Sequence, residues 1–390
     1  MKIVDVSAFY TPHGGGVRTY VDRKLTYAAA AGHEMVVIIP GAHDGQETLP
    51  GGGRLISIAS PKLIFDGRYR YFRSAEPVHA LLDAEQPDIV EASSPWRTAN
   101  IVADWKGPAR KALFMHADPM STYAYRWFGQ IAAKDTIDRG FAFFWNHLRR
   151  AAQQFDTIIC ANPFLTERMT EAGIKRVTTL PLGIEADCFS PAHRSEALRA
   201  RLLAECELGP DAPLLLGVGR LSPEKRWPMI IRAVTKASAR RPMGLVLIGH
   251  GRERATILKA IGGNPHIRLI DGVEDRSTLA AIMASADGLV HGCESETFGL
   301  VVAEAAASGL PLILPDEGGA SGFADPARGE LYRAANVKSL ARAIEAFLRR
   351  DATTLRAAAA DYAPHVLSIQ DHFDQLFQSY ALLINQRMAA

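Results

Sequence analysis

Short runs of apolar, mostly aliphatic residues recur along the chain and alternate with longer segments of helical periodicity. A run that is apolar at nearly every position is typical of a strand covered on both faces, as in parallel sheets. Strands that alternate with helices form βαβ units and define the α/β class. The runs lie at residues 3–6, 35–39, 157–160, 214–218, 245–248 and 311–314. We therefore predict an α/β protein built from doubly wound parallel sheets.

The alternation pauses between residues 182 and 211, in a stretch that contains Gly183, Pro191 and a polar helical segment. A new strand then starts at Leu214, which indicates a second domain. We predict an N-terminal Rossmann-like domain at residues 1–185 and a C-terminal one at residues 186–364. Residues 365–390 should form a terminal helix, because apolar residues recur there at three- and four-residue spacing.

Composition excludes several classes of protein. The chain has 390 residues, 48% of them hydrophobic, and 44 Lys and Arg residues against 42 Asp and Glu residues. This balance argues against disorder and against bulk nucleic acid as a partner. The four cysteines lack metal-ligand spacing, which favours a reducing compartment. We expect no signal peptide and no membrane-spanning segment.

Two glycine-rich segments follow strands and could hold phosphate groups. Gly14, Gly15 and Gly16 come directly after the first strand, where a helix N-terminus can bind an anion, although a flexible turn is an equal alternative. Gly219 follows the strand at 214–218, with Arg220 and Lys225 close behind. Two cations at the carboxyl edge of a sheet suit a diphosphate leaving group. The alternative is a solvated basic loop.

A pair of glutamates flanks the start of a third segment. Glu296 should lie in a loop, with Phe298 and Gly299 at the N-terminus of the following helix and Glu304 inside that helix. This helix is apolar nearly all round, so a carboxylate within it needs a partner, such as ligand hydroxyls. The alternative is a helix with ordinary exposed acids.

His116 ends a predicted strand and could donate to a sugar hydroxyl or to a leaving-group oxygen. A structural histidine bonded to backbone is the equal alternative. The sequence contains neither an Asp-x-Asp pair to clamp a metal–nucleotide complex nor a G-x-S-x-G nucleophile elbow.

Taken in order, these segments resemble the retaining glycosyltransferases of family four, which have the GT-B fold. The segments at 14–16, 182–185, 219–225, 248–251 and 296–304 carry the resemblance. It implies two Rossmann-like domains facing across a cleft, with a nucleoside-diphosphate sugar bound mainly by the C-terminal domain. It also implies that the terminal helix crosses back to the N-terminal domain. Three positions depart from the usual family pattern, namely Leu182, His250 and Cys293, the last of which stands where Ser is common.

The resemblance also assigns roles to residues. Arg220 and Lys225 should hold the diphosphate, Glu304 the ribose and Glu296 the donor sugar, while His116 reaches that sugar from the other domain. The implied catalytic set is His116, Glu296, Arg220 and Lys225, and the implied donor-binding set is Gly15, Gly16, Gly219, Phe298, Gly299, Leu300 and Glu304. Transfer should retain the anomeric configuration, with no metal and no cofactor besides the nucleotide-sugar substrate.

Two basic, aromatic stretches at residues 54–73 and 141–150 suit the surface of an anionic bilayer, or else are a solvated rim and a packing helix. The segments at 87–95 and 294–297 look like the branch that glycosylates diacylglycerol, including sulfoquinovosyl transferases. We therefore expect a UDP-sugar donor, a membrane-lipid acceptor, no nucleic-acid partner, and a cytoplasmic location that includes the inner membrane face. The alternatives are a GDP-mannose or UDP-sugar dependent enzyme that builds a polysaccharide or polyprenyl-linked glycan, and a non-catalytic nucleotide-sugar binding protein.

Overall fold

A computed structural model describes residues 1–11, 16–49, 52–63, 66–116, 118, 120, 124, 134–185 and 187–388. The chain divides into two compact units. Unit 1 consists of Met1–Asp118, Trp127–Pro181 and Gln370–Ala390, and unit 2 consists of Pro119–Arg126 and Leu182–Ile369. The terminal helix is thus assigned to the same unit as the N-terminal half of the chain. The sequence-based boundaries at 185/186 and 364/365 lie near the crossings at 181/182 and 369/370.

Unit 1 contains an eight-stranded sheet. Its order is β10 (Val177–Thr179), β9 (Thr157–Cys160), β8 (Arg110–Met115), β7 (Ile89–Ala92), β1 (Lys2–Val6), β2 (Glu34–Gly41), β4 (Arg54–Ala59) and β3 (Gly45–Thr48). All neighbours pair in parallel except β3, which runs antiparallel to β4 at the edge. The central strands are buried along nearly their whole length, as their continuous apolar runs predict. Separately, β5 (Lys62–Leu63) pairs antiparallel with β6 (Asp66–Arg70).

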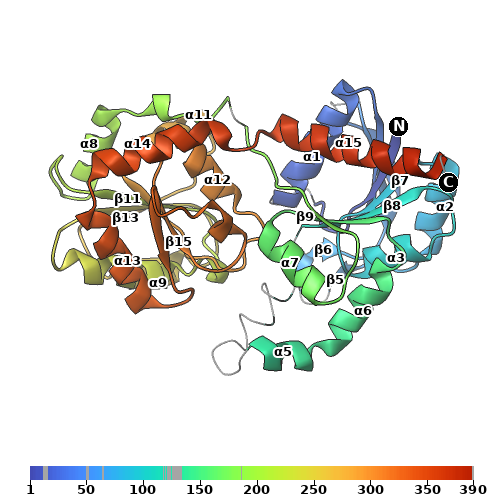
Figure 1. The fold of residues 1–390 in the computed structure, drawn as a ribbon, viewed down its shortest axis with the longest axis horizontal. Helices are drawn as coiled ribbons and strands as arrows, with labels where there is room; N and C mark the ends of the chain where they lie inside the picture. The colour runs from blue at the N-terminus through green and yellow to red at the C-terminus, as the bar shows by residue number, and fades with distance from the viewer. Residues whose placement is uncertain are drawn as a thin grey trace. The chain divides into compact units, whose positions relative to one another are not determined.

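Helices cover both faces of this sheet. On one face α1 (Gly16–Ala30) packs against the terminal helix α15 (Ile369–Met388), drawn in red in Figure 1, through the rings of Tyr20 and Phe373, whose centroids are 5.3 Å apart. The other face carries α3 (Arg97–Asp104) and α6 (Ala142–Ala152). In the described part of unit 1 the other helices are α2 (Glu76–Glu85), α5 (Lys134–Gly140) and α7 (Pro163–Glu171).

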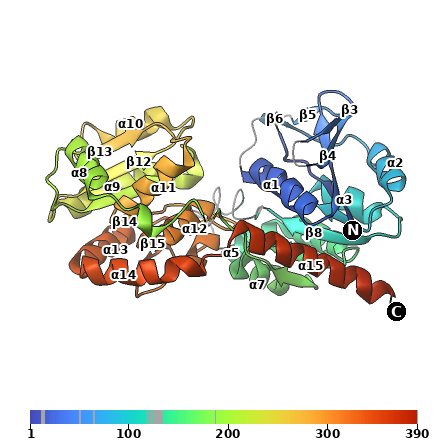
Figure 2. The ribbon, with the colours of Figure 1, turned by 90° about the horizontal axis from the view of Figure 1, so that it is seen from above.

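Unit 2 contains a six-stranded sheet in which every pairing is parallel. Its order is β13 (Ile267–Ile270), β12 (Gly244–Ile248), β11 (Leu214–Val218), β14 (Gly288–Val290), β15 (Leu312–Pro315) and β16 (Gly329–Tyr332). Its helices form two layers, seen on opposite sides of the sheet in Figures 1 and 2. One layer holds α9 (Trp227–Ser238), α10 (Arg254–Ile261) and α13 (Val337–Arg349), and the other holds α8 (Glu196–Glu205), α11 (Arg276–Ser285), α12 (Leu300–Ala307) and α14 (Ala352–Tyr362).

The core of unit 2 lies between the sheet and the first of these layers. Ile230 and Val234 of α9, together with Ile344 and Phe347 of α13, face the strands at helical spacing and are buried. The α/β class and the doubly wound parallel sheets predicted from the sequence are confirmed. Among the helices that the structure describes, none has both the length and the apolar character needed to cross a membrane.

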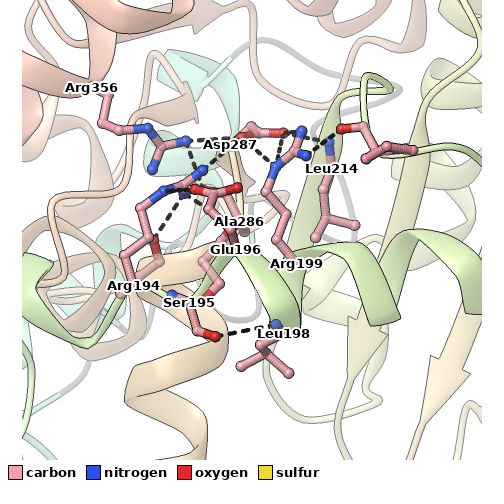
Figure 3. A network of polar contacts seen from close by, with 12 residues as sticks. Arg194, Ser195, Glu196, Leu198, Arg199, Leu214, Ala286, Asp287 and Arg356 are labelled. Atoms are coloured by element: carbon pink, nitrogen blue, oxygen red, sulfur yellow. Dashed lines mark hydrogen bonds and ion pairs between the residues drawn. The ribbon is translucent and has the colours of Figure 1, made fainter.

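A network of arginines fastens the amino ends of the strands in unit 2 (Figure 3). Asp287, which precedes β14, accepts hydrogen bonds from Arg199 at 2.6 Å, Arg356 at 2.8 Å and the backbone N–H of Leu214 at 2.8 Å. Arg194 donates to the carbonyls of residues 284–286 at the C-terminus of α11, where a cation is favoured. These contacts tie α8, α11 and α14 to the sheet. These contacts give the amino ends of β11 and β14 a structural role.

Strand order reverses between β11 and β14 in unit 2, and between β1 and β7 in unit 1. Successive connections leave such a point in opposite directions, which opens a crevice at the carboxyl ends of the two strands. In unit 2 this switch point lies where β11 gives way to Gly219 and where β14 gives way to His291. The two segments that the sequence analysis identified in the second half of the chain, at 219–225 and 296–304, therefore both follow strands at this point.

Candidate functional site

The turn after β11 is packed tightly against the turn after β12. Leu221 donates its backbone N–H to the carbonyl of His250 at 2.7 Å. A Cβ at Gly249 would lie 1.9 Å from the carbonyl oxygen of Gly219, and Gly219 itself has φ of 149°. Larger residues cannot be accommodated at these two positions, because the backbones approach too closely and φ is positive. The glycines thus fix the path of the segment that carries Arg220 and Lys225.

The two predicted cations sit in different surroundings. The side chain of Arg220 is 68% exposed and lies 3.4 Å from Glu224, while its carbonyl accepts a hydrogen bond from the Trp227 indole. Lys225 ends a 3-10 turn (Pro223–Lys225), is only 12% exposed, and forms an ion pair with Glu296. Arg220 thus presents an accessible positive charge, whereas the charge of Lys225 is already compensated within the protein.

Lys225, His291 and Glu296 form a cluster that we call the edge cluster. His291 Nε2 lies 3.6 Å from the same Glu296 oxygen that meets Lys225. Burial opposes charge on Lys225 and on Glu296, but their attraction outweighs it, raising the lysine pKa and lowering that of the carboxyl. Burial also lowers the pKa of His291 to about 4, so the imidazole is neutral. The edge cluster therefore holds a charged pair beside a neutral imidazole.

The loop that carries Glu296 is held from two sides. Arg226 forms a two-pronged contact with Glu294, with Nε 2.6 Å from Oε2, and Gly319 donates its N–H to the carbonyl of Glu296 at 2.7 Å. A Cβ at Gly318 would lie 2.3 Å from the carbonyl oxygen of Glu294. The sequence interpretation missed this second glycine turn, although two adjacent glycines shortly after a strand were a usable signal.

Glu304 occupies the second turn of α12, which begins at Leu300 after Gly299, as the sequence predicted. Its side chain is only 9% exposed and accepts a hydrogen bond from Arg276 at 2.9 Å. Arg276 Nε also lies 3.3 Å from Glu185. The buried carboxylate thus has the partner that its burial requires. Sequence reasoning missed Arg276, which lies at the start of α11 and carries no motif of its own.

His116 directly follows β8 in unit 1, as predicted. Its ring stacks on Phe114 with centroids 4.4 Å apart, and its Nε2 atom is buried with no hydrogen-bond partner among the described residues. Burial lowers the pKa of His116 to about 3, which keeps the imidazole neutral. Gly16 begins α1, where a Cβ would meet no atom within 4 Å. Gly15 lies outside the described residues, so the predicted closure of this turn over phosphates stays a prediction.

Unit 1 also contains a cluster that the sequence interpretation did not identify, here called the buried charge cluster. Asp5, Lys24 and Glu91 are all fully buried, with Lys24 Nζ 3.3 Å from Asp5 and 2.5 Å from Glu91. Tyr380 of α15 donates to Glu91, and Ser93 donates to Asp5 at 2.7 Å. Burial raises the pKa of Asp5 to about 6 despite Lys24. The available signal was Asp5 inside the apolar run at 3–6 and Glu91 between aliphatic residues of the segment at 87–95.

Comparison with known proteins gives the following similarities. Residues 202–366 match a family model described as glycosyl transferases group 1, and residues 14–187 match one described as glycosyltransferase family 4. A GDP-mannose-dependent alpha-mannosyltransferase of Mycobacterium tuberculosis is 30% identical over 335 residues, which is 84% of this chain and 82% of that protein. A GDP-mannose-dependent alpha-(1-6)-phosphatidylinositol dimannoside mannosyltransferase of the same species is 29% identical over 315 residues, covering 80% and 79%.

The same two-domain fold is found among solved structures. The structure of sucrose-phosphate synthase from Thermosynechococcus elongatus superimposes with a TM-score of 0.77 over 99% of this chain and 100% of that one, at 19% identity. At this identity the likeness concerns the fold alone. It agrees with two Rossmann-like units of GT-B type.

Proposed function

Because this chain belongs to glycosyltransferase family 4, we propose that it moves a hexose from a nucleoside-diphosphate sugar to a hydroxyl group of a membrane lipid, with retention of configuration. The observation that carries the site assignment is the Lys225–Glu296 ion pair at the switch in strand order between β11 and β14. Open α/β sheets bind ligands at this position. A cation at the crevice suits the diphosphate, and a carboxylate suits sugar hydroxyls.

The charges of unit 2 suit the separate parts of such a donor. Arg220 and Lys225 would neutralise the diphosphate as the bond to the sugar breaks, which is where negative charge develops. Glu304, held by Arg276, would accept hydrogen bonds from the ribose hydroxyls. Glu296 would accept from a sugar hydroxyl, with the backbone of residues 298–300 beside it. His116, whose neutral imidazole has a buried nitrogen with no hydrogen-bond partner among the described residues, would contact the donor sugar.

Retention needs no protein nucleophile if attack and departure occur on one face of the sugar. In that route the bond from the anomeric carbon to the phosphate oxygen breaks while the bond to the acceptor oxygen forms. The acceptor proton passes to the departing phosphate oxygen, and the nucleoside diphosphate leaves. None of these steps requires a metal ion, because Arg220 and Lys225 would stabilise the departing diphosphate. The residues of unit 2 act by stabilising the leaving group.

We propose GDP-mannose as the first donor to test, because two relatives that match about four fifths of the chain are named as GDP-mannose-dependent. A UDP-sugar, which the sequence motifs favour, is the second. Calorimetric titration with GDP-mannose, UDP-glucose and UDP-galactose should show binding to one nucleotide class. Glu304→Gln should weaken that binding about tenfold or more, since a hydrogen bond to a charged group contributes roughly 1.5–3 kcal/mol.

The matched control for that titration is Glu345→Gln, which removes a surface ion pair with Arg240 in the same unit. It should leave donor affinity unchanged. Equal affinity in wild type and Glu304→Gln would overturn the ribose assignment. Absence of binding and of transfer with every nucleotide sugar would overturn the proposed activity, and binding without transfer to any extracted acceptor would favour the non-catalytic alternative.

A lipid acceptor is supported by an aromatic surface on unit 1. Phe143 of α6 is 67% exposed, and Trp96, just before α3, is 39% exposed. They lie on neighbouring elements, since Trp96 packs on Phe144 with ring centroids 5.0 Å apart. Arg149 and Arg150 are exposed at the C-terminus of the same helix. Exposed aromatic rings beside arginines are typical of contact with an anionic bilayer surface.

Flotation with vesicles containing anionic phospholipid tests this surface. Phe143→Ser should reduce the fraction of protein that floats, whereas Leu382→Ser, which alters a 58% exposed apolar residue of α15, should not. Reversing the charges of Arg70 and Arg73 should act in the same direction as Phe143→Ser. If wild-type protein does not float and instead glycosylates a soluble or polyprenyl-linked glycan, the lipid-acceptor proposal fails and the glycan alternative replaces it.

A further inference from the structure

Three potential metal ligands of different chemistry converge beside the edge cluster. His291 Nε2, Cys293 Sγ and a carboxylate oxygen of Glu296 all lie within 4.8 Å of one another. They come from one short segment that follows β14. His291 and Cys293 are buried, at 3% and 2% exposure, and the Glu296 side chain is 21% exposed. The group is therefore dry on one side and accessible on the other.

The fold does not account for this arrangement. His291 Nε2 is buried and has no hydrogen-bond partner among the residues that the structure describes. Burying such a nitrogen without a partner carries a free-energy cost. The nitrogen faces the Glu296 oxygen at 3.6 Å, too long for a hydrogen bond. Cys293 is a free thiol that contacts Ser295 at 3.3 Å, at a position where the family resemblance leads us to expect Ser.

We propose that His291, Cys293 and Glu296 form a zinc site, and that zinc bound there inhibits sugar transfer. Imidazole, thiolate and carboxylate are the ligands that zinc takes in proteins, and the thiol argues against magnesium or calcium, which prefer oxygen. Three protein ligands leave the fourth coordination position of zinc open. Solvent can reach that position on the exposed side of Glu296. The inhibitory part of this inference rests on the proposed function, whereas the zinc site itself does not.

The contact between Lys225 and Glu296 explains why bound zinc would inhibit sugar transfer. Its ammonium group contacts the Glu296 carboxylate that zinc would bind, so the two cations compete for one anion. When zinc binds, the S–H bond of Cys293 breaks, a zinc–sulfur bond forms, and the proton passes to solvent. Lys225 then leaves Glu296, which its flexible stem allows. Glu296 is then no longer available to bind the donor sugar. Lys225 is no longer held where it would contact the diphosphate.

The competition also limits affinity. A structural zinc site is closed by four protein ligands, whereas here a lysine must be displaced and one position stays open. We expect reversible binding that a chelator removes without unfolding the protein. Donor and zinc should each weaken the binding of the other, because both need Glu296.

Equilibrium dialysis against zinc chloride in a reducing, phosphate-free buffer tests the site. It compares the full-length wild type with the full-length Cys293→Ser variant. Wild type should bind one equivalent, and Cys293→Ser should bind at least tenfold more weakly. The control is Cys188→Ser, which removes the most accessible of the four cysteines and should bind zinc as wild type does. Cobalt chloride gives an independent reading, because a cobalt–thiolate bond produces a near-ultraviolet charge-transfer band that Cys293→Ser should lack.

Equal zinc affinity in wild type and Cys293→Ser, or a cobalt complex without the thiolate band, would overturn the site. If Cys293→Ser has a lowered melting temperature, His291→Gln supplies the second variant and should show the same loss. Inhibition is measured as the rate with zinc relative to the zinc-free rate of the same variant. Zinc binding without any donor binding would sink the proposed function alone, and donor turnover without zinc binding would sink the zinc site alone.

Discussion

Each unit of the molecule pairs a lysine with carboxylate groups, two in unit 1 and one in unit 2, but the two clusters differ in solvent access. In the buried charge cluster of unit 1, Lys24, Asp5 and Glu91 are all at 0% exposure. In the edge cluster of unit 2, Lys225 and Glu296 retain 12% and 21% exposure. The fully buried groups are satisfied by Ser93 and Tyr380, while the edge cluster contains a histidine nitrogen that has no hydrogen-bond partner within the described part of the chain.

The difference separates a structural role from a binding role. Charges that are fully removed from water must be satisfied by the protein itself, and no ligand can reach them. Charges that stay partly exposed, as in the edge cluster, keep part of their hydration and can exchange one partner for another. We therefore expect the same residue types to support the fold in unit 1 and to bind the donor in unit 2. Replacing both lysines by the same residue tests this distinction directly.

The largest effect is expected for Lys24→Met. It leaves two carboxylates in a sealed site without a cation, and breaking a buried ion pair in this way costs about 3–5 kcal/mol. The free energy of unfolding, measured by urea denaturation, should fall by about that amount. Lys2→Met, which removes a partly exposed lysine from Glu34 and Glu85, should cost about 1 kcal/mol or less. A stable Lys24→Met protein would contradict the structural role.

Lys225→Met should have the opposite profile. Because Lys225 and Glu296 are partly hydrated, stability should change by less than half of the loss in Lys24→Met. Donor affinity should fall by about 10- to 100-fold, since a charge-assisted contact to phosphate contributes roughly 1.5–3 kcal/mol. Calorimetry measures this, with Lys236→Met on the exposed face of α9 as the control. Unchanged donor affinity would mean that the edge cluster, like the buried one, is only structural.

Arg276→Gln should have a smaller effect, of about three- to tenfold on donor affinity, because Arg276 acts through Glu304 rather than on the donor. The effect should shrink when the nucleotide lacks its ribose hydroxyls, since there is then nothing for Glu304 to hold. Titrating both proteins with a nucleoside diphosphate and its 2′,3′-dideoxy analogue separates the two cases. An equal loss with both nucleotides would show that Arg276 merely supports the fold.

The smallest expected effect concerns pH. Burial raises the pKa of Asp5 to about 6 from its usual 3.8, so the folded protein takes up a proton at a higher pH than the unfolded chain. Lowering the pH from 7 to 5 should therefore increase the stability of wild type relative to Asp5→Asn, and this gain should end near pH 4. The gain in the free energy of unfolding should be only on the order of 1 kcal/mol. Asp5 and Glu91 share Lys24 and therefore titrate as a coupled pair, which limits the effect of either group alone. Urea denaturation of both proteins at the two pH values measures it.

Local features of the site were predictable from sequence, and partners across long sequence distances were not. The apolar runs predicted parallel strands, and the glycines at 219 and 299 marked where strand and helix ends lie. The partner of Glu304 is Arg276, 28 residues away, and the partner of Glu296 is Lys225, 71 residues away. Lys225 belongs to a recognisable segment after a strand, so its role could be predicted. Arg276 is one of many arginines on helices, and nothing in the sequence distinguishes it.

The buried charge cluster shows the same limit. Asp5 and Glu91 stand out as acids within apolar strands, but nothing near them in sequence indicates that Lys24, on a helix with other charged residues, is their common partner. Only the parallel pairing of β1 with β7 brings Asp5 and Glu91 into register. Strand order therefore had to be known before the cluster could be recognised.

The position of α15 in unit 1 has a consequence for synthesis. Tyr380, which donates to Glu91, follows it by 289 residues, and the whole of Leu182–Ile369 is translated in between. At about 5–20 residues per second, the ribosome adds the last partner of Glu91 roughly 15–60 s after Glu91 itself. During that interval most of unit 2 leaves the ribosome and can begin to fold, while the first-made half of unit 1 still lacks the helix that packs on α1. The half of the protein that is made first is thus the last to be finished, and it is the half that would depend on chaperones.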